Sequence, residues 1–182
     1  MPSDWSRSWE VDRLVAGQLS FDGEVPLASM PRLQDRIEVA STGSAGSKVA
    51  RARLSFGKEH GANVARILVA AEVPLRCERC MGLMSWPVRT EATLALAADL
   101  SSADAVPAGL EPVLAEQGRV VLRDLVEEEL LLALPLVARH EDAADCAAGA
   151  GAGKFDNAAD NAVADEVTQK PFAQLKDLLK QR

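Results

Sequence analysis

The sequence predicts an α+β fold, in which a mainly antiparallel sheet of about five strands is covered by one helix over residues 124–134. Two observations carry this prediction. Stretches with strand-like alternation or β-branched composition follow one another between residues 48 and 97, with only short turns between them. An acidic and then apolar segment runs from Asp124 to Leu134 and stops at Pro135, as helices commonly do.

The first forty residues mix helix and turn signals. Residues 9–15 fit either a strand or a short helix, and Pro31 stands at the first position of a short predicted helix. Residues 48–56 alternate apolar and polar side chains with an imperfect register, which indicates a half-buried strand. A turn over residues 57–61 then predicts a hairpin with the following strand.

Residues 64–73 carry the strongest strand signal, because they are rich in Val and Ile and are followed by Pro74. The strand pattern resumes over residues 86–97. The cysteines Cys77 and Cys80 are therefore expected in the connection between two neighbouring antiparallel strands. Residues 101–118 contain Pro, Gly and acidic residues and are predicted to be a long loop, after which residues 120–121 fit a last short strand.

The predicted helix over residues 124–134 begins with acidic residues. Asp124 is a suitable N-cap, and Glu127 three residues later completes a capping-box pattern. The three consecutive glutamates at 127–129 also suit the positive end of the helix dipole. We interpret this acidic cluster as a cap and a solvated face rather than an acid/base site. The inward face is expected to contain Leu125, Val126, Leu130, Leu131 and Leu134.

Composition divides the chain into three parts. Residues 1–141 form the predicted α+β domain. Residues 142–170 consist largely of Ala, Gly, Asp and Asn, which bury too little apolar surface to offset their ordering entropy, so we expect a flexible linker. Residues 171–182 form a predicted amphipathic helix on this tether, and its apolar face, with Phe172 and Leu175, docks either on its own domain or on a partner.

Several features indicate a cytoplasmic protein without a membrane span. No apolar run approaches the roughly 18 residues of a spanning helix, and the first residues lack the apolar core of a secretory signal. The chain has 3 cysteines, an odd number that does not suit a disulfide framework. We also find no phosphate-binding glycine loop and no catalytic triad, so neither a small-molecule substrate nor an enzymatic reaction is predicted.

Charge is distributed unevenly. The net charge is −7, yet residues 1–90 hold 12 Lys/Arg and 10 Asp/Glu, whereas residues 91–182 hold 8 and 17. An acidic protein is a poor general binder of nucleic acid, because phosphate contacts need Lys and Arg. If the protein touches RNA, its first half is the expected surface, with arginines that include Arg51, Arg53, Arg66, Arg76, Arg79 and Arg89. The alternative interpretation of these arginines is an ordinary solvated surface.

Four residues have the composition of a structural zinc site, namely Cys77, Cys80, His140 and Cys146. The Cys-x-x-Cys spacing suits one half of such a site, and Arg76 and Arg79 would help to stabilise thiolates. Two alternatives stay open. A redox dithiol would need the motif at a helix N-terminus near a βαβ unit, which the predicted antiparallel strands disfavour. The cysteines could also serve structure or recognition without a metal.

The ordered set of motifs resembles the YceD-like family of bacterial large ribosomal RNA subunit accumulation proteins. The set comprises Cys-x-Arg-Cys at 77–80, the Glu-Glu-Leu-Leu-Leu-Ala-Leu-Pro segment at 128–135, His140, Cys146 and a closing Pro-Phe-x-x-Leu-Lys at 171–176, and it covers roughly residues 15–180. The chain departs from the family pattern at Lys170, where members often have Asn, and near His140, where a second Pro is replaced by Val137 or Ala138.

The resemblance implies a cytosolic role in ribosome biogenesis, in support of 23S ribosomal RNA, and it implies no catalytic residue. We therefore expect a non-enzymatic factor that binds ribosomal RNA or a ribosomal, processing or assembly protein. The expected contact residues are Arg76, Arg79, Arg89, Phe172 and Leu175. The alternatives are a zinc-stabilised protein interaction module that affects ribosomes indirectly, or a Cys-x-x-Cys thiol oxidoreductase.

Overall fold

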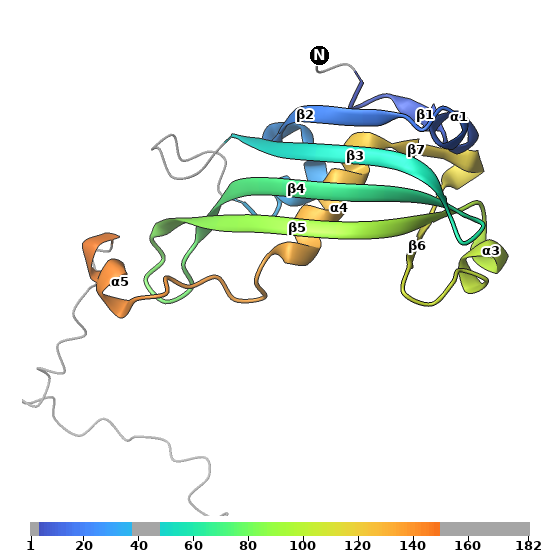
Figure 1. Cartoon of the computed structure of the whole chain (residues 1–182). Coiled ribbons are helices and arrows are strands. Elements are labelled where there is room, and N and C mark those ends of the chain that lie inside the picture. The colour runs from blue at the N-terminus through green and yellow to red at the C-terminus, as the bar shows by residue number, and fades with distance from the viewer. Residues whose placement is uncertain (1–3, 38–47, 150–182) are drawn as a thin grey trace, which may run out of the picture. The chain divides into compact units, whose positions relative to one another are not determined.

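A five-stranded sheet organises the protein, whose computed structural model describes residues 4–37 and 48–149 (Figure 1). β2 to β5 pair antiparallel, and β6 pairs with β5 in parallel. The predicted α+β class with a mainly antiparallel sheet of five strands is therefore confirmed. In sheet order, the strands are β2 (Ser20–Pro26), β3 (Val49–Glu59), β4 (Ala62–Arg76), β5 (Leu83–Ala97) and β6 (Glu111–Leu114).

One face of the sheet is buried and the other is exposed, as strand β3 illustrates. Its inward side chains are Ala50, Ala52, Leu54 and Phe56, and the residues between them are exposed. The register looked imperfect in the sequence because two of the inward positions are alanines, which are weak markers of burial. The turn to β4 is confirmed and is tighter than expected, since only His60 and Gly61 separate the strands, both with positive φ.

Strand β4 does not end at Pro74, contrary to the sequence prediction, but continues to Arg76. Pro74 pairs with Ser85 of β5, whereas the pairing between β3 and β4 extends only to Ala71. Beyond that point β4 has a neighbour on one side only, and a proline without an N–H group is tolerated at such a sheet edge. The strand therefore carries the chain directly to Cys77.

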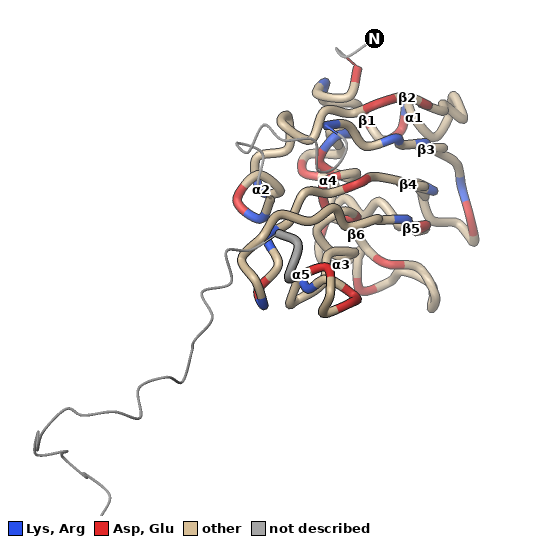
Figure 2. The backbone as a smooth tube through the Cα atoms, turned by 90° about the vertical axis from the view of Figure 1, so that its left-hand side faces the viewer, with Lys and Arg blue, Asp and Glu red and all other residues tan. Residues whose placement is uncertain are grey.

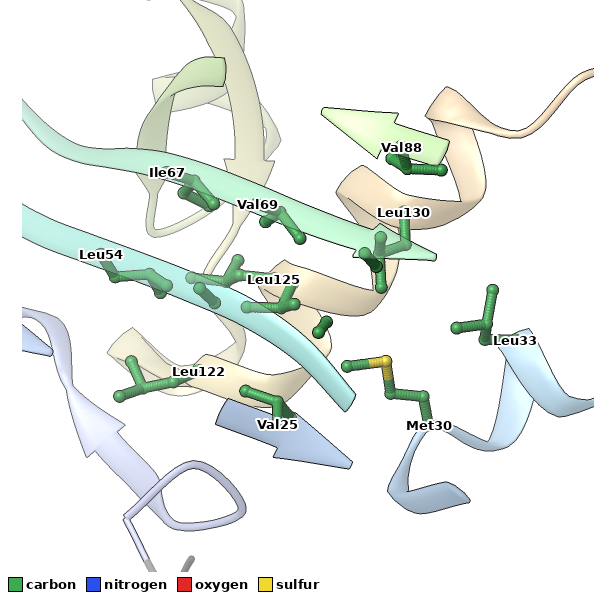
Figure 3. Close-up of a cluster of buried hydrophobic side chains, with 14 of the residues drawn as sticks. Val25, Met30, Leu33, Leu54, Ile67, Val69, Val88, Leu122, Leu125 and Leu130 are labelled. Atoms are coloured by element: carbon green, nitrogen blue, oxygen red, sulfur yellow. The ribbon is translucent and has the colours of Figure 1, made fainter. Parts of the chain in front are cut away.

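Helix α4 (Leu122–Ala133) covers the buried face of the sheet (Figure 1). Its side chains Leu122, Leu125, Val126 and Leu130 are buried, and three of them are among those predicted to face inward. Figure 3 shows this apolar stripe against side chains of β2, β3, β4 and β5. Burial of each such side chain contributes about 1.5–3 kcal/mol relative to exposure, so the helix face is a main source of stability.

A second, two-stranded sheet joins the beginning of the chain to α4. β1 (Ser8–Glu10) pairs antiparallel with β7 (Arg119–Val121), which is the predicted last short strand. The segment that fitted either a strand or a helix contains both, because β1 is followed at once by α1 (Val11–Ala16). β7 leads into α4 without a loop.

The long loop predicted for residues 101–118 is wrong. This segment contains most of α3 (Leu100–Asp104), strand β6, and a 3₁₀ turn, η2 (Glu116–Gly118). Asp99 and Ser102 cap α3 reciprocally, and the Ser102 N–H donates to the Asp99 carboxylate at 2.7 Å. β6 is only four residues long, and its pairing with β5 is a long-range contact that a local pattern does not reveal.

The predicted N-cap of the covering helix is also wrong. α4 begins at Leu122, its N-cap is Val121, and Asp124 lies within the first turn with an ion pair to Arg123 at 2.7 Å. The helix starts earlier because β7 runs directly into it. The glutamates at 127–129 therefore lie in the middle of α4, too far along the helix to cap its N-terminus.

Glu127 is buried, with 2% of its surface exposed, and it caps a different helix. Its carboxylate accepts a hydrogen bond of 2.9 Å from the N–H of Leu33, in the first turn of α2 (Pro31–Gln34). The N-cap residue of α2, Met30, provides no side-chain cap. The first N–H groups of a helix lack partners within it, so Glu127 supplies the acceptor that α2 lacks. The short helix predicted from Pro31 is confirmed.

Glu129 is the second buried carboxylate of α4, with 5% exposed. Burial raises its pKa above the ordinary 4.5, the Thr90 hydroxyl acts to lower it, and the negative charges of Glu111 and Glu128 raise it further. The expected solvated acidic face is thus wrong for two of its three glutamates. Glu128 alone is substantially exposed, in an ion pair with Arg32 at 2.7 Å.

Part of the segment predicted to be a linker is helical, namely α5 (Ala143–Gly149). The described residues all belong to one compact unit, which ends near α5. The rest of the predicted linker and the predicted helix at 171–182 lie outside the described residues. Among helices in the described part of the chain, none has the length and apolar character needed to cross a membrane.

Replacing Glu127 with Ala should lower the free energy of unfolding by about 1–3 kcal/mol, because the buried Leu33 N–H loses its acceptor. Glu128→Ala is the matched control, since it removes an exposed ion pair worth about 0–1 kcal/mol. Glu127→Gln keeps an oxygen acceptor and should fall between the two. Urea unfolding followed by circular dichroism measures all three, and equal losses for the two alanine variants would contradict the assigned cap.

Replacing Glu129 with Gln should raise the melting temperature at neutral pH. A carboxyl whose pKa is raised in the folded state stabilises the fold below its ordinary pKa of 4.5, and this contribution is lost as pH rises through the folded-state value. The advantage of the variant over the wild type should therefore grow from pH 4.5 upward and then level off. Melting curves across this pH range, with Glu128→Gln as control, test it; a pH-independent difference would refute it.

Candidate metal centre

The loop between β4 and β5 presents the first pair of thiols. The Cys77 N–H donates to the Gly82 carbonyl at 2.8 Å, and the Met81 N–H donates to the Cys77 carbonyl at 2.8 Å. Met81 has a φ of 59°, which lets the chain turn back into β5. These bonds hold Cys77 and Cys80 on one tight turn at the end of the hairpin, where the sequence predicted them.

The second pair arrives on the segment after α4. Pro135 follows the helix, and the chain then runs past the cysteine loop, where the Glu78 N–H donates to the Ala138 carbonyl at 2.8 Å. His140 follows, and α5 then carries Cys146. The Asp142 carboxylate accepts a bond of 2.9 Å from the Ala144 N–H and so caps the start of α5.

The structure brings all four predicted ligands together. The ligand atoms of Cys77, Cys80, His140 and Cys146 lie within 4.8 Å of one another. Cys77 Sγ is 3.8 Å from Cys146 Sγ, and His140 Nδ1 is 3.4 Å from Cys146 Sγ and 3.6 Å from Cys80 Sγ. All three cysteines are free thiols, and Cys77 and Cys146 are buried. Such a group can hold a metal ion.

The local electrostatics favour a thiolate at Cys77. Burial acts to raise the pKa of this thiol, but backbone N–H groups of His140, Cys80 and Arg79 act against it, and the result is a pKa lowered from 9.0 to about 5. Cys80 behaves in the opposite way. The Gly82 N–H acts to lower the pKa of Cys80, but burial and the neighbouring sulfurs of Cys146 and Cys77 outweigh it, and the pKa is raised.

Arg79, between the two cysteines of the loop, points its guanidinium at the second pair. Its Nε donates to Cys146 Sγ at 3.0 Å. Its Nη2 donates to the carbonyls of His140 at 3.2 Å and Asp142 at 3.0 Å. The Arg79 side chain thus contacts the sulfur of Cys146 and the backbone of His140, the two candidate ligands of the second pair.

Of the residues expected to contact RNA or a partner, the three that the structure describes do not form one cluster. Arg76 donates to the Met81 carbonyl at 2.8 Å within its own loop, and Arg79 is engaged at the thiols. Arg89 is exposed on the open face of the sheet, roughly 20 Å along β5 from the start of that strand. Phe172 and Leu175 lie outside the described residues. These contacts stay predictions.

Comparison with known sequences identifies the family to which the chain belongs. A family model described as "Large ribosomal RNA subunit accumulation protein YceD" matches residues 65–179, which include the hairpin, α4 and all four candidate ligands. The chain belongs to the YceD family. The resemblance drawn from the ordered motifs is therefore confirmed, although the match begins at residue 65 rather than near residue 15.

A named relative of this chain supports the same family assignment. The large ribosomal RNA subunit accumulation protein YceD of Haemophilus influenzae is 38% identical over 73 residues. The aligned segment makes up 40% of this chain and 42% of that protein, so it spans less than half of each. No solved structure matches the chain.

Sequence reasoning missed how the ligand pairs are joined. The Ala138 carbonyl accepts from Glu78 and the Asp142 carbonyl accepts from Arg79, and no local pattern encodes either contact between the two loops. The position of Arg79 inside the Cys-x-x-Cys motif was a usable signal, because an arginine so placed lies within reach of any ligand that joins the two cysteines.

Proposed function

We propose that this protein is a non-enzymatic ribosome biogenesis factor that supports the accumulation of large-subunit (23S) ribosomal RNA. The match of the YceD family model over residues 65–179 carries this proposal. Both the family and the Haemophilus influenzae relative are named for accumulation of the large ribosomal RNA subunit. We place the protein in the cytoplasm, where thiols are kept reduced.

The factor acts by binding ribosomal RNA or a ribosomal or assembly protein. Figure 2 marks both basic and acidic positions along the strands of the sheet, so its open face supports either partner. Arg53 pairs with Asp22, and Arg51 lies 3.4 Å from Glu24, each across neighbouring strands. The net charge of −7 favours a basic protein, whereas an RNA contact would use exposed arginines such as Arg89.

We further propose that the four clustered ligands bind a structural zinc ion. Zinc bonds of about 2.3 Å to sulfur and 2.0–2.1 Å to nitrogen give tetrahedral edges of about 3.8 Å between sulfurs and about 3.5–3.6 Å between sulfur and nitrogen. The separations of 3.8, 3.6 and 3.4 Å lie close to these edges. Four protein ligands fill a tetrahedral site and leave no open position for catalysis, which supports a structural role.

Depletion of the protein should lower the ratio of large- to small-subunit ribosomal RNA in cells, because the large subunit would lose an assembly factor. Rescue by the wild type should restore the ratio, and rescue by Cys77→Ser/Cys80→Ser should not if the thiol loop is needed. Quantification of total ribosomal RNA measures the effect. An unchanged ratio on depletion would refute the proposed function.

Binding of the purified protein to large-subunit ribosomal RNA at several salt concentrations separates the two kinds of partner. Arg89→Glu removes an exposed arginine from the open sheet face, and Arg13→Glu, an exposed position on α1, is the matched control. If the open face contacts phosphate, Arg89→Glu should weaken association with large-subunit RNA. The slope of the logarithm of the association constant against the logarithm of the salt concentration should become shallower by about 1. Unchanged, salt-insensitive association favours the protein partner.

The purified full chain should bind one zinc ion, and removal of that ion by a chelator should lower its melting temperature, since a structural metal contributes folding free energy. Cys146→Ser should weaken binding by more than the roughly 10–100-fold typical of residues outside the ligand set. Zinc content and competition titrations measure this. A wild-type chain that binds no zinc under reducing conditions would refute the metal site.

A further inference from the structure

We propose that Arg79 is the positioning residue of the metal centre: it holds Cys146 and the backbone around His140 against the cysteine loop, and it offsets the charge of the bound site. This inference rests on the proposed zinc site. It also assigns the side chain a use different from the RNA contact expected from sequence.

The first step of the argument is geometric. Arg79 is fixed at its base by the Cys-x-x-Cys turn, and its guanidinium reaches the other ligand pair through the Cys146 sulfur at 3.0 Å and the carbonyls of His140 and Asp142 at 3.2 and 3.0 Å. The three acceptors belong to the two ligands, His140 and Cys146, and to Asp142 in the segment between them. Arg79 therefore determines where both members of the second pair lie relative to the first.

The second step concerns charge. A divalent zinc ion with three thiolates and a neutral histidine carries a net charge of −1. A buried charge is costly unless it is paired and hydrogen-bonded. Cys77 and Cys146 are both buried, so the site needs a compensating cation nearby. The Arg79 guanidinium is such a cation, at hydrogen-bond distance from one of the sulfurs.

The third step explains why the residue is arginine. A guanidinium presents several N–H donors in a rigid plane, whereas a lysine ammonium is a single point charge on a flexible stem. Arg79 uses Nε for the sulfur and Nη2 for two carbonyls at once. A lysine would keep the charge but could not make this set of bonds. Substitution by lysine can therefore separate the positive charge of Arg79 from its planar set of N–H donors.

The test compares Arg79→Gln and Arg79→Lys with Arg76→Gln in the full chain. Arg76 is the last residue of β4, next to Cys77, and it donates to the Met81 carbonyl; its variant is matched in charge change. Cobalt(II) and zinc titrations of metal-free protein, against a chelator of known affinity, give the dissociation constants. The thiolate-to-cobalt absorption bands report how many sulfurs bind.

We expect Arg79→Gln to weaken metal binding about 10–100-fold, the usual effect of losing a residue that supports a ligand. Its cobalt complex should show weaker thiolate bands per metal ion, because Cys146 is no longer held in place. Arg79→Lys should recover part of the affinity, and Arg76→Gln, which leaves the Arg79 contacts in place, should bind metal more tightly than Arg79→Gln. In metal-free protein, Cys146 should be alkylated several-fold faster in Arg79→Gln than in wild type, as measured by mass spectrometry.

Wild-type affinity and wild-type Cys146 protection in Arg79→Gln would overturn the inference and leave the zinc site standing. A wild-type chain that binds no metal would instead refute the zinc site, and the alkylation rates of metal-free protein would still decide whether Arg79 positions Cys146. If Arg79→Gln fails to fold, Arg79→Lys carries the test, and full affinity in that variant would overturn the role of the planar guanidinium.

Discussion

The burial of α4 against the sheet is the interaction on which the other features depend. Its apolar side chains, such as Leu125 and Leu130, fix the helix across several strands. Once the helix is fixed, Glu127 faces the start of α2 and can cap it. The helix ends at Ala133, and the chain then runs through Pro135 toward the β4–β5 loop, which brings His140 and Cys146 to the first two cysteines.

The two ligand pairs are far apart in sequence, and His140 comes 60 positions after Cys80. This separation argues less against a metal site than it first suggests. The entropy of loop closure grows only with the logarithm of loop length. In this fold, moreover, the long β4–β5 pairing and the packing of α4 already bring the ends together, so the metal need only order the final loop and α5.

Local sequence patterns were sufficient for strands β3, β4 and β5 and for the hairpin position of Cys77 and Cys80, because alternation and turn residues act over a few positions. They failed where a distant partner decides the outcome. The glutamates at 127–129 have the composition of a helix start, but β7 runs straight into α4 and moves the start to Leu122. Strand β6 likewise depends on β5, and the capping of α2 depends on a carboxylate 94 residues away.

The arrangement at the thiols also limits where an RNA contact can lie. Arg79 is exposed, but its Nε and Nη2 donors are already engaged by Cys146 and by backbone carbonyls. The remaining basic side chains of interest lie on the open sheet face, where Arg51 and Arg53 face acidic partners on β2. Exposed ion pairs of this kind are worth about 0–1 kcal/mol, so an incoming phosphate can replace the carboxylate at little cost.

The same weakness lets a basic protein take the opposite set of partners, because its lysines and arginines can pair with the carboxylates of Asp22 and Glu24 instead. The open face is therefore not committed to one partner by its net charge. The two kinds of partner differ in which side chains they bind. RNA would bind the arginines and free the carboxylates, whereas a basic protein would bind the carboxylates and free the arginines. Counterion release from RNA makes only the first strongly dependent on salt.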